Sequence, residues 1–340
     1  DIKKGNTMKK IDLENHFYND YSVEVLQGRS GKGYPYWDEA SNAVWFMEQV
    51  SMDHTVLGPK LMDFAEKRIP EMEKLDIVKA VISLAPGIDI LPAEESVDAC
   101  RQANDALYEL TQRYPRLVGS AILPMFDADA AVKELERCVK DLGFVMWQAH
   151  SNIAGRHHDE EQFRPIWKKV EELGIFAYLH PNYNPLNDMF NDYGYPMAGP
   201  GLGFTADTSG AIIRIMLSGM LDEMPELKIV LGHYGEALPF LMERLDNRMA
   251  MLPEPKQHND EKPSYYFGRN IMVTTSGNTS IPAFECTRAA IGMDSIFLGT
   301  DYPFESMTEC IEYLERCPMS HLDREKLYYK NAVDRLGISL

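Results

Sequence analysis

The sequence predicts an α/β fold in which eight parallel strands and their helices close into one TIM barrel, (β/α)8, with a long insertion after the first strand. Strand-like apolar runs alternate with helix-like stretches along the 340 residues. Such alternation implies parallel pairing, and eight units fit a closed barrel better than an open sheet. No Pro- or Ser-rich linker divides the chain, so we expect a single domain over residues 8–340.

The first strand is expected at residues 11–16, and a polar, aromatic segment follows it over residues 17–59. This insertion has little periodicity, and a stretch of that length is more typical of a functional loop than of a connector. Apolar residues at roughly helical spacing then predict a helix over residues 61–75. The other strands are predicted at residues 77–84, 117–124, 144–148, 175–180, 229–233, 270–275 and 296–301. Helices are predicted between them at residues 94–114, 130–142, 162–173, 210–224, 236–251 and 282–291, with a helical C-terminus.

Composition narrows the class of protein. Hydrophobic residues make up 45% of the chain, which allows a large core, and the formal charge of -18 disfavours nucleic acid or an anionic membrane as partner. The five cysteines form no Cys-x-x-Cys motif, which favours reduced thiols in a cytoplasmic protein. No apolar run reaches the roughly 18 residues of a membrane span. Met8 is a candidate start, which would leave residues 1–7 as an expression remnant or a disordered end.

Potential metal ligands stand at the ends of several predicted strands. Glu14 and His16 are two apart on the first strand and therefore project to the same side. His180, His233 and Asp301 each end a later strand, and barrel active sites lie at the carboxyl ends of the strands. Glu14, His16, His180 and Asp301 together offer two imidazoles and two carboxylates, a set that suits Mn²⁺ or Zn²⁺ and leaves positions open for a substrate.

A second group of polar residues follows the strand that ends at His233. Glu236 is three residues further on, close enough to orient the imidazole. Alternatively, its carboxylate only interacts favourably with the positive end of its helix dipole. Arg244 and Arg248 lie one helical turn apart on the next helix. Either arginine could grip a carboxylate if it reaches a cleft, or both could be solvated helix charges.

These motifs, taken in order, resemble a known family. The set Leu13-Glu14-Asn15-His16, Tyr178-Leu179-His180-Pro181, Gly232-His233-Tyr234-Gly235-Glu236, Arg244-Leu245-Asp246 and Gly299-Thr300-Asp301-Tyr302-Pro303 is similar to the decarboxylase branch of the amidohydrolase superfamily. Within it, the chain most resembles the nonoxidative hydroxybenzoate decarboxylases that act on γ-resorcylate, 2,3-dihydroxybenzoate and 5-carboxyvanillate. The two-metal hydrolases usually carry a bridging Lys on the fourth strand, and residues 144–148 contain none, so one divalent ion is expected.

The resemblance implies a carbon-carbon lyase that acts in the breakdown of aromatic acids as a homodimer or homotetramer. Mn²⁺ is the favoured ion and Zn²⁺ the alternative, held by the four strand-end ligands. Asp301 would deliver a proton to the ring carbon that bears the carboxylate, while His233 with Glu236 would instead deprotonate the phenol or relay the proton. Arg244 would hold an anionic group, in one version across a subunit contact. Either the cluster of Tyr34, Tyr36 and Trp37 or the pair Phe17 and Tyr18 is expected to wall the pocket for a planar ring. The alternative is that the insertion only packs against a neighbouring subunit.

Two other classes of function stay open on the residues alone. A mononuclear hydrolase of a lactone or ester would use the same ligands to ionise water. A noncatalytic metal-binding barrel would need no His-Glu pair beside its ion. Release of CO₂ from hydroxybenzoates, as opposed to hydrolysis of lactones, would separate the three.

Overall fold

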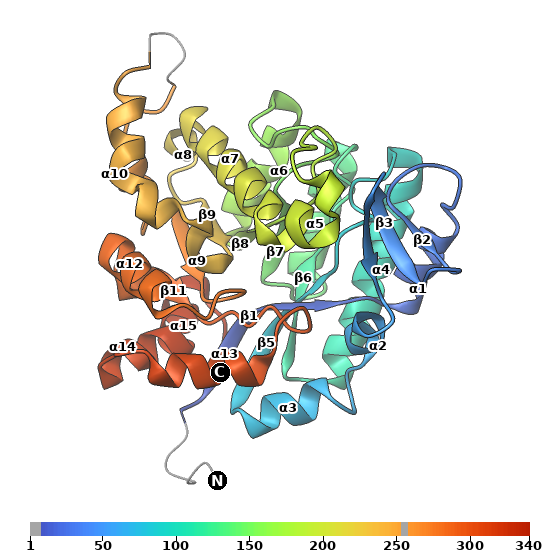
Figure 1. Ribbon diagram of the computed structural model, residues 1–340, viewed down its shortest axis with the longest axis horizontal. Helices are drawn as coiled ribbons and strands as arrows, with labels where there is room; N and C mark the ends of the chain where they lie inside the picture. The colour runs from blue at the N-terminus through green and yellow to red at the C-terminus, as the bar shows by residue number, and fades with distance from the viewer. Residues whose placement is uncertain (1–7, 253–257) are drawn as a thin grey trace.

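A computed structural model describes residues 8–252 and 258–340 as a barrel of eight parallel strands (Figure 1). The strands are β1 (Lys10–Phe17), β5 (Ile77–Leu84), β6 (Leu117–Ala121), β7 (Met146–His150), β8 (Phe176–His180), β9 (Lys228–Leu231), β10 (Ile271–Thr274) and β11 (Ile296–Phe297), hydrogen-bonded in that order. The backbone after β11 returns to β1, because Leu13 N donates to Leu298 O and Asp301 N donates to Glu14 O. The predicted TIM barrel is therefore confirmed, and residues 1–7 lie outside the described chain.

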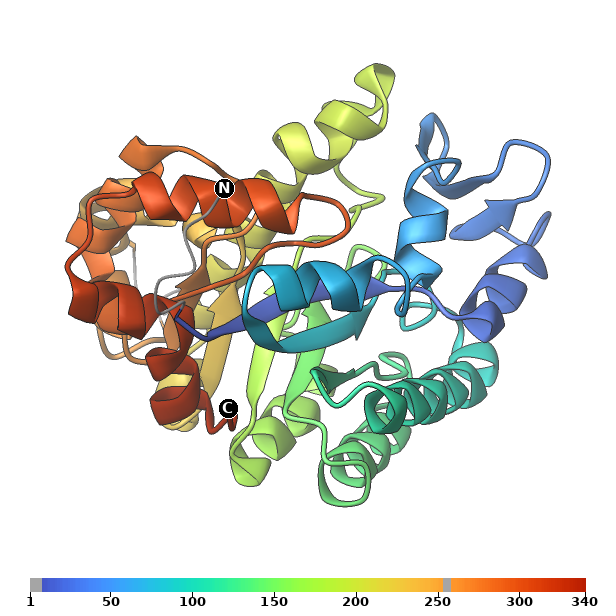
Figure 2. The same ribbon diagram turned by 90° about the horizontal axis from the view of Figure 1, so that it is seen from below.

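Two apolar layers hold the barrel together. The inside is filled by side chains from the strands themselves, among them Leu13, Met146, Phe176, Val230 and Met272, all completely buried. The larger layer lies between the sheet and the helices that surround it. Figure 2 shows these helices around the strands. Since both faces of each strand are covered, the strands read as nearly continuous apolar runs in the sequence.

The helices alternate with the strands as predicted, with several changes of length. They are α2 (Leu57–Met62), α3 (Arg68–Lys74), α4 (Ala93–Arg113), α5 (Ala128–Lys140), α6 (Arg164–Leu173), α7 (Gly203–Leu217), α8 (Met220–Glu223), α9 (His233–Glu236), α10 (Leu238–Met249), α11 (Pro263–Tyr266), α12 (Ile281–Ile291), α13 (Met307–Arg316), α14 (His321–Glu325) and α15 (Asn331–Leu336). The single helix predicted over residues 61–75 is wrong: α2 and α3 are separate helices. The helix predicted over 210–224 begins earlier and is divided at Gly219, whose φ is positive.

The insertion is an ordered unit with secondary structure that its low periodicity did not predict. It contains α1 (Asp20–Gln27), capped by Asn19, and an antiparallel sheet of β2 (Tyr36–Asp38), β3 (Ala43–Met47) and β4 (Val50–Asp53). Figure 1 places this unit at one side of the barrel. Its strands are only three to five residues long, so they carry too few residues for a periodic signal to stand out.

Strand ends differ from the prediction at two places that matter for the site. β7 runs to His150, two residues beyond the predicted end, and β11 stops at Phe297, four residues before Asp301. The five cysteines are free thiols, as predicted. Within the described ranges, no helix combines the length and the apolar character needed to cross a membrane.

Candidate metal centre and active site

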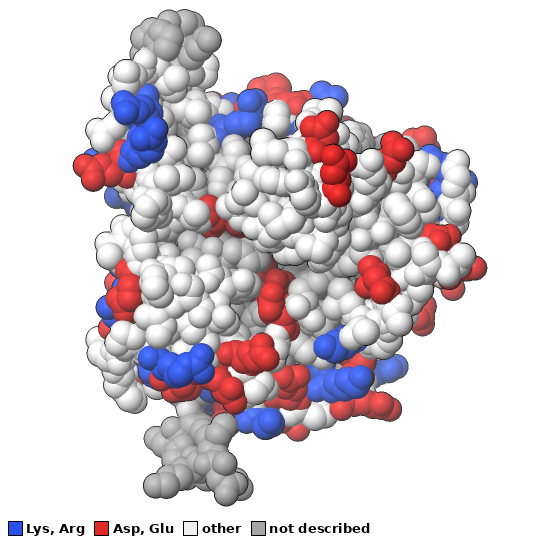
Figure 3. Space-filling view, viewed as in Figure 1, with Lys and Arg blue, Asp and Glu red and all other residues white. Residues whose placement is uncertain are grey.

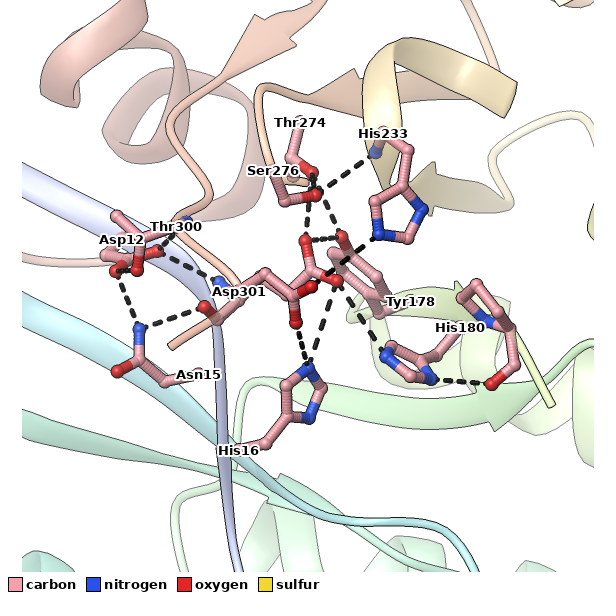
Figure 4. Close-up of polar contacts among 12 residues, drawn as sticks. Asp12, Asn15, His16, Tyr178, His180, His233, Thr274, Ser276, Thr300 and Asp301 are labelled. Atoms are coloured by element: carbon pink, nitrogen blue, oxygen red, sulfur yellow. Dashed lines mark hydrogen bonds and ion pairs between the residues drawn. The ribbon is translucent and has the colours of Figure 1, made fainter. Parts of the chain in front are cut away.

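Four side chains converge at the carboxyl ends of β1, β8 and β11. One ligand atom from each of Glu14, His16, His180 and Asp301 lies within 4.8 Å of the others, and all four residues are buried. His16 Nε2 is 3.1 Å from Asp301 Oδ1 and 3.9 Å from Glu14 Oε1, while His180 Nε2 is also 3.9 Å from Glu14 Oε1 (Figure 4). The structure thus brings together the four residues that the sequence singled out as ligands.

The residues fit a divalent cation because their facing atoms lack other partners. Glu14 Oε1, His16 Nε2 and Asp301 Oδ1 are buried without a hydrogen bond. Buried polar atoms normally find a partner, so three acceptors aimed at one point indicate a cation site. Two imidazole nitrogens and two carboxylate oxygens suit Mn²⁺ or Zn²⁺.

The remaining atoms of these ligands are held by hydrogen bonds. His180 Nδ1 lies 2.8 Å from Pro181 O, which places the proton on Nδ1 and leaves Nε2 free for the ion. Glu14 Oε2 accepts hydrogen bonds from the Tyr178 hydroxyl and from Thr274 Oγ1 at 3.2 Å. These contacts turn the other carboxylate oxygen of Glu14, Oε1, toward the point where the four ligand atoms converge.

A backbone irregularity in β1 aims its two ligands inward. Ile11 and Leu13 point into the barrel interior, yet Glu14 and His16 point inward as well. If side chains alternated strictly along β1, the odd-numbered pair and the even-numbered pair could not all point inward. The register between β1 and β5, however, shifts between Asp12 and Asn15. Such bulges re-aim side chains next to active sites.

His233 lies beside the ligands and is paired with Glu236. His233 Nδ1 is 2.5 Å from Glu236 Oε1, and the other oxygen of Glu236 accepts from Thr205 Oγ1 at 2.8 Å. His233 Nε2 faces Asp301 Oδ2 at 3.8 Å. Asp301 therefore turns one oxygen to His16 and the other to His233 (Figure 4).

The charges of the site shift the pKa values of its members. Burial alone would lower the pKa of His233, but Glu236 and Asp301 outweigh it and hold that pKa well above its ordinary value. Burial and the nearby His16 lower the pKa of His180, which favours the neutral form that binds a metal. Although burial opposes it, the nearby carboxylates of Asp301 and Glu14 raise the pKa of His16 to about 9. A proton and a divalent cation therefore compete for His16 Nε2.

A cavity of about 610 Å³ opens onto this group of residues. His180, His233, Glu236 and Asp301 form part of its lining, so the candidate ligands and the His-Glu pair face one space. That volume lies within the range of small-molecule sites, which are mostly apolar with a few polar groups at defined positions. The arrangement therefore joins a metal site, a paired imidazole and a binding cavity.

The structure does not bring Phe17, Tyr18 or Trp37 to the cavity wall, contrary to the prediction. Phe17 is completely buried and packs edge-on against Phe64, because it alternates with His16 on β1 and so points away from the metal side. The Tyr18 ring packs against Trp37, and both are buried. The insertion does contribute to the wall, but through residues of β3, β4 and α2: Phe46, Met52, Asp53 and Leu57.

Arg244 lies on the exposed surface of α10 and is not among the cavity-lining residues of its own chain. Arg248 is exposed on the same helix. Within one chain, neither arginine reaches the site, so a role for Arg244 requires a second subunit.

The sequence analysis did not identify the imidazole–carboxylate pair formed by His150 and Asp89. His150 is opposite His180 in the register of β7 and β8, and its ring meets the ring of His180 edge-on at 5.8 Å. His150 Nδ1 is 2.6 Å from Asp89 Oδ2, and both side chains are buried. Extending the predicted strand by two residues would have placed His150 on the inward face with Gln148.

Comparison with known proteins decides the family. The model of the family described as "Amidohydrolase" matches residues 83–338. The chain belongs to the amidohydrolase family. Gamma-resorcylate decarboxylase of Rhodococcus jostii (strain RHA1) is 35% identical over 340 residues, which is 95% of this chain and 97% of the relative. The family resemblance read from the sequence is thereby confirmed.

Solved structures of other members share the whole fold. The 2,6-dihydroxybenzoate decarboxylase from Rhizobium is 32% identical with a TM-score of 0.83, and the match covers 97% of this chain and 99% of that one. The 5-carboxyvanillate decarboxylase from Sphingomonas paucimobilis is 26% identical with a TM-score of 0.85, over 98% and 100% of the two chains. A dihydroxybenzoic acid decarboxylase from Polaromonas, 32% identical with a TM-score of 0.83 over 97% of both chains, was solved with manganese and the inhibitor 2-nitroresorcinol.

Proposed function

We propose that this chain is a metal-dependent nonoxidative decarboxylase of an ortho-hydroxylated benzoate. The observation that carries this function is the convergence of four ligands with free, buried atoms on a cavity that His233 also faces. Gamma-resorcylate and 5-carboxyvanillate decarboxylases among its relatives support the same chemistry, and the predicted carboxy-lyase class is confirmed.

The four ligands would hold one divalent ion, with manganese favoured because related structures carry it and zinc as the alternative. When bound, the ion supplies Lewis acidity that orients the substrate carboxylate and ortho-hydroxyl and stabilises phenolate charge. Tyr178 and Thr274 keep Glu14 in its orientation, and Pro181 does the same for His180. These contacts preorganise the site before the substrate arrives.

Proton delivery is assigned to His233 and Asp301. Loss of CO₂ directly from the ring would leave an electron pair outside the π system, and this is avoided if the carboxyl-bearing carbon is protonated first. His233 Nε2 lies 3.8 Å from Asp301 Oδ2, so a protonated His233 would relay its proton through Asp301, which borders the cavity. The proton passes to the ring carbon, and the C–C bond to the carboxylate then breaks. Its electron pair restores the aromatic ring as CO₂ leaves.

A homodimer or homotetramer would complete the site. The exposed Arg244 of α10 would then reach the cavity of the partner subunit and bind an anionic group of its substrate. Apolar side chains on the same helix support a subunit contact there, since Phe240 is 79% exposed. The free state of all five cysteines supports a reducing compartment such as the cytoplasm.

The test is to load the protein with Mn²⁺ and to follow CO₂ release and ring absorbance with hydroxybenzoates, beside hydrolysis of lactones and esters. We expect CO₂ release, and in D₂O one deuterium at the ring carbon that lost the carboxylate. Hydrolysis of a lactone or ester, with no deuterium on a ring, would establish the alternative function. Binding of a benzoate without any turnover would favour a noncatalytic barrel.

The role of His233 is tested by His233→Ala. This variant should keep its metal, because the four ligands are untouched, yet lose at least about two orders of magnitude in rate. His321→Ala is the matched control, since the His321 side chain is 80% exposed and is not among the residues that line the cavity. His180→Ala should instead lose most of its metal by elemental analysis. Near-normal turnover of His233→Ala with its metal bound would remove His233 from the mechanism.

A further inference from the structure

Resting on the proposed function, we infer that this cavity selects a hydroxybenzoate whose ring carries a bulky apolar substituent and no second anionic group. The inference concerns the part of the cavity away from the metal ligands. Its wall, its charge and its volume each support this substrate class.

The wall is an aromatic cluster assembled from three separate segments. The ring of Phe46, from β3 of the insertion, stacks on Tyr183 with centroids 4.4 Å apart and planes inclined by 26°. Phe204, at the start of α7, meets Tyr183 edge-on at 4.9 Å. All three line the cavity. Aromatic walls of this kind bind flat or apolar groups through a large contact area.

The end of the cavity next to the candidate metal ligands differs chemically from this aromatic cluster. Phe304 meets the ring of His16 edge-on at 5.2 Å, so it marks the side of the cavity next to a ligand. Met52 and Leu57, from β4 and α2, add aliphatic surface to the wall formed with Phe46. A substrate whose carboxylate lies at the ligands would therefore extend its ring substituents against apolar side chains.

The charge of the lining opposes a second anionic group. Among the described residues that line the cavity there is no Lys or Arg, whereas Asp53, Glu236, Asp301 and Glu305 each contribute a carboxylate. Figure 3 agrees, since the hollow on the face it shows is bordered by acidic atoms and the basic groups lie toward the edges of the molecule. The ion and the partner subunit's Arg244 would compensate the one carboxylate that reacts. Another buried anion would lack a counter-charge.

The volume exceeds what one unsubstituted ring needs. At about 610 Å³, the cavity is in the middle of the range that accommodates drug-sized ligands. Ligand sites usually enclose most of their ligand, and apolar wall atoms without a contact partner lose dispersion energy. A single dihydroxybenzoate would leave the Phe46, Tyr183 and Phe204 surface largely uncovered.

The experiment uses the Mn²⁺-loaded enzyme with 2,6-dihydroxybenzoate, its 3-propyl and 4-propyl derivatives, and its 4-carboxy derivative. The two propyl isomers cover every open ring carbon, because positions 3 and 5 are equivalent. We expect one propyl isomer to exceed the parent at least about tenfold in kcat/KM, since each buried methylene contributes several-fold. The 4-carboxy derivative should fall below the parent at least about tenfold. Two propyl isomers at or below the parent, or a 4-carboxy derivative above it, would overturn the inference.

A binding measurement separates this inference from the proposed function. 2-Nitroresorcinol and its 4-propyl and 5-propyl derivatives have no carboxylate to lose, so calorimetry reports the same preference without turnover. If no benzoate releases CO₂, the proposed function fails, and the ratio of Kd values still decides whether the cavity prefers apolar substituents. If both propyl derivatives bind as tightly as 2-nitroresorcinol or more weakly, the preference for apolar substituents is rejected.

Variants connect the preference to the aromatic wall. Phe46→Ala and Phe204→Ala should each lower the ratio of propyl to parent kcat/KM about fivefold, because each removes part of the contact surface. Phe126→Ala is the matched control: Phe126 is 40% exposed and does not line the cavity. An unchanged ratio in both wall variants would mean that the substituent binds elsewhere.

Discussion

The candidate catalytic side chains are held by unusual backbone conformations. His233 has φ of 52° and Asp301 has φ of 60°, both in the left-handed region that residues with a Cβ seldom adopt. Glu236 has φ of 55°. Such strain collects at functional sites, where the surrounding structure imposes it. Here the hydrogen bond from His233 N to Ser276 Oγ at 3.1 Å is one of the contacts that holds the turn.

Gly277 should be required for the position of the His233 ring. Its φ is 62°, and a Cβ added there would lie 2.4 Å from His233 Cδ2. Gly277→Ala should push the imidazole out of line with Asp301 and lower kcat about a hundredfold, since displacements near 1 Å have effects of this size. Metal content should stay unchanged, because the clash reaches none of the four ligands. Steady-state kinetics and elemental analysis measure the two effects.

Gly143→Ala is the control for this variant. Gly143 has a similar φ of 71°, but an added Cβ meets nothing within 4 Å. It should show the stability cost of a left-handed backbone, about 1 kcal/mol, with normal kcat. If Gly277→Ala behaves like Gly143→Ala, then the His233 position does not depend on this contact.

At the scale of elements, Arg68 connects α3 to the strand that carries two ligands. Its guanidinium is completely buried, donates to Asn15 Oδ1 at 3.1 Å and to His16 O at 2.6 Å, and lies over the ring of Tyr302 at 4.7 Å. Burial lowers the pKa of Arg68 to about 10. Asn15 in turn donates to Asp12 Oδ2 at 2.6 Å. This network holds the backbone beside the register shift between Asp12 and Asn15.

Arg68→Met should lower the free energy of unfolding by about 3 kcal/mol, because it leaves two buried acceptors, Asn15 Oδ1 and His16 O, without a donor. Urea unfolding of the metal-free protein measures this loss. Arg156→Met is the matched control. Arg156 pairs with Glu160 on the surface and is 52% exposed, so its loss should cost less than about 1 kcal/mol. Equal costs in the two variants would contradict a special role for Arg68.

At the scale of the whole molecule, Arg244 is expected to act across a subunit contact. Arg244→Ala and His233→Ala should each be nearly inactive alone. Co-expressed as mixed dimers, they should regain about a quarter of wild-type activity, because half of the dimers then contain one site with both residues intact. No recovery in mixed dimers of confirmed composition would place Arg244 outside the partner's site.

The stability of the barrel should decrease in mild acid through His158. This side chain is buried between Trp147 and Trp167, and burial lowers its pKa from 6.5 to about 4. The folded state thus binds a proton less readily than the unfolded state. The stabilisation is complete above pH 6.5 and is lost as the pH falls toward 4. From pH 7 to pH 5 the free energy of unfolding should fall by about 2 kcal/mol through this residue.

Comparison with His158→Gln isolates that effect. Other buried groups titrate in the same window, among them Asp12, whose pKa burial raises to about 6. Urea unfolding at pH 7 and pH 5 should therefore give a difference between the two pH values that is about 2 kcal/mol smaller in His158→Gln than in the wild type. The same pH dependence in both proteins would show that His158 does not contribute.

The sequence by itself predicted the barrel and the meeting of its four candidate metal ligands. Apolar runs alternating with helices imply parallel strands, and the carboxyl ends of parallel strands meet at one edge. Glu14, His16, His180 and Asp301 could therefore be placed together from strand positions alone, although β11 ends well before Asp301. The His233-Glu236 pair followed from a spacing of three residues at a turn, where local geometry is sufficient.

Only the tertiary structure decided which way side chains point and which distant residues meet. The bulge in β1 turns Glu14 inward while Phe17 points outward, and no local pattern shows a register shift. Likewise, the cavity wall joins Phe46, Tyr183 and Phe204 from segments far apart in the chain. Side-chain direction depends on the register of neighbouring strands, and contacts between distant segments depend on how the insertion packs on the barrel. Neither property is contained in residue spacing, which is why the ligands were predictable and the cavity wall was not.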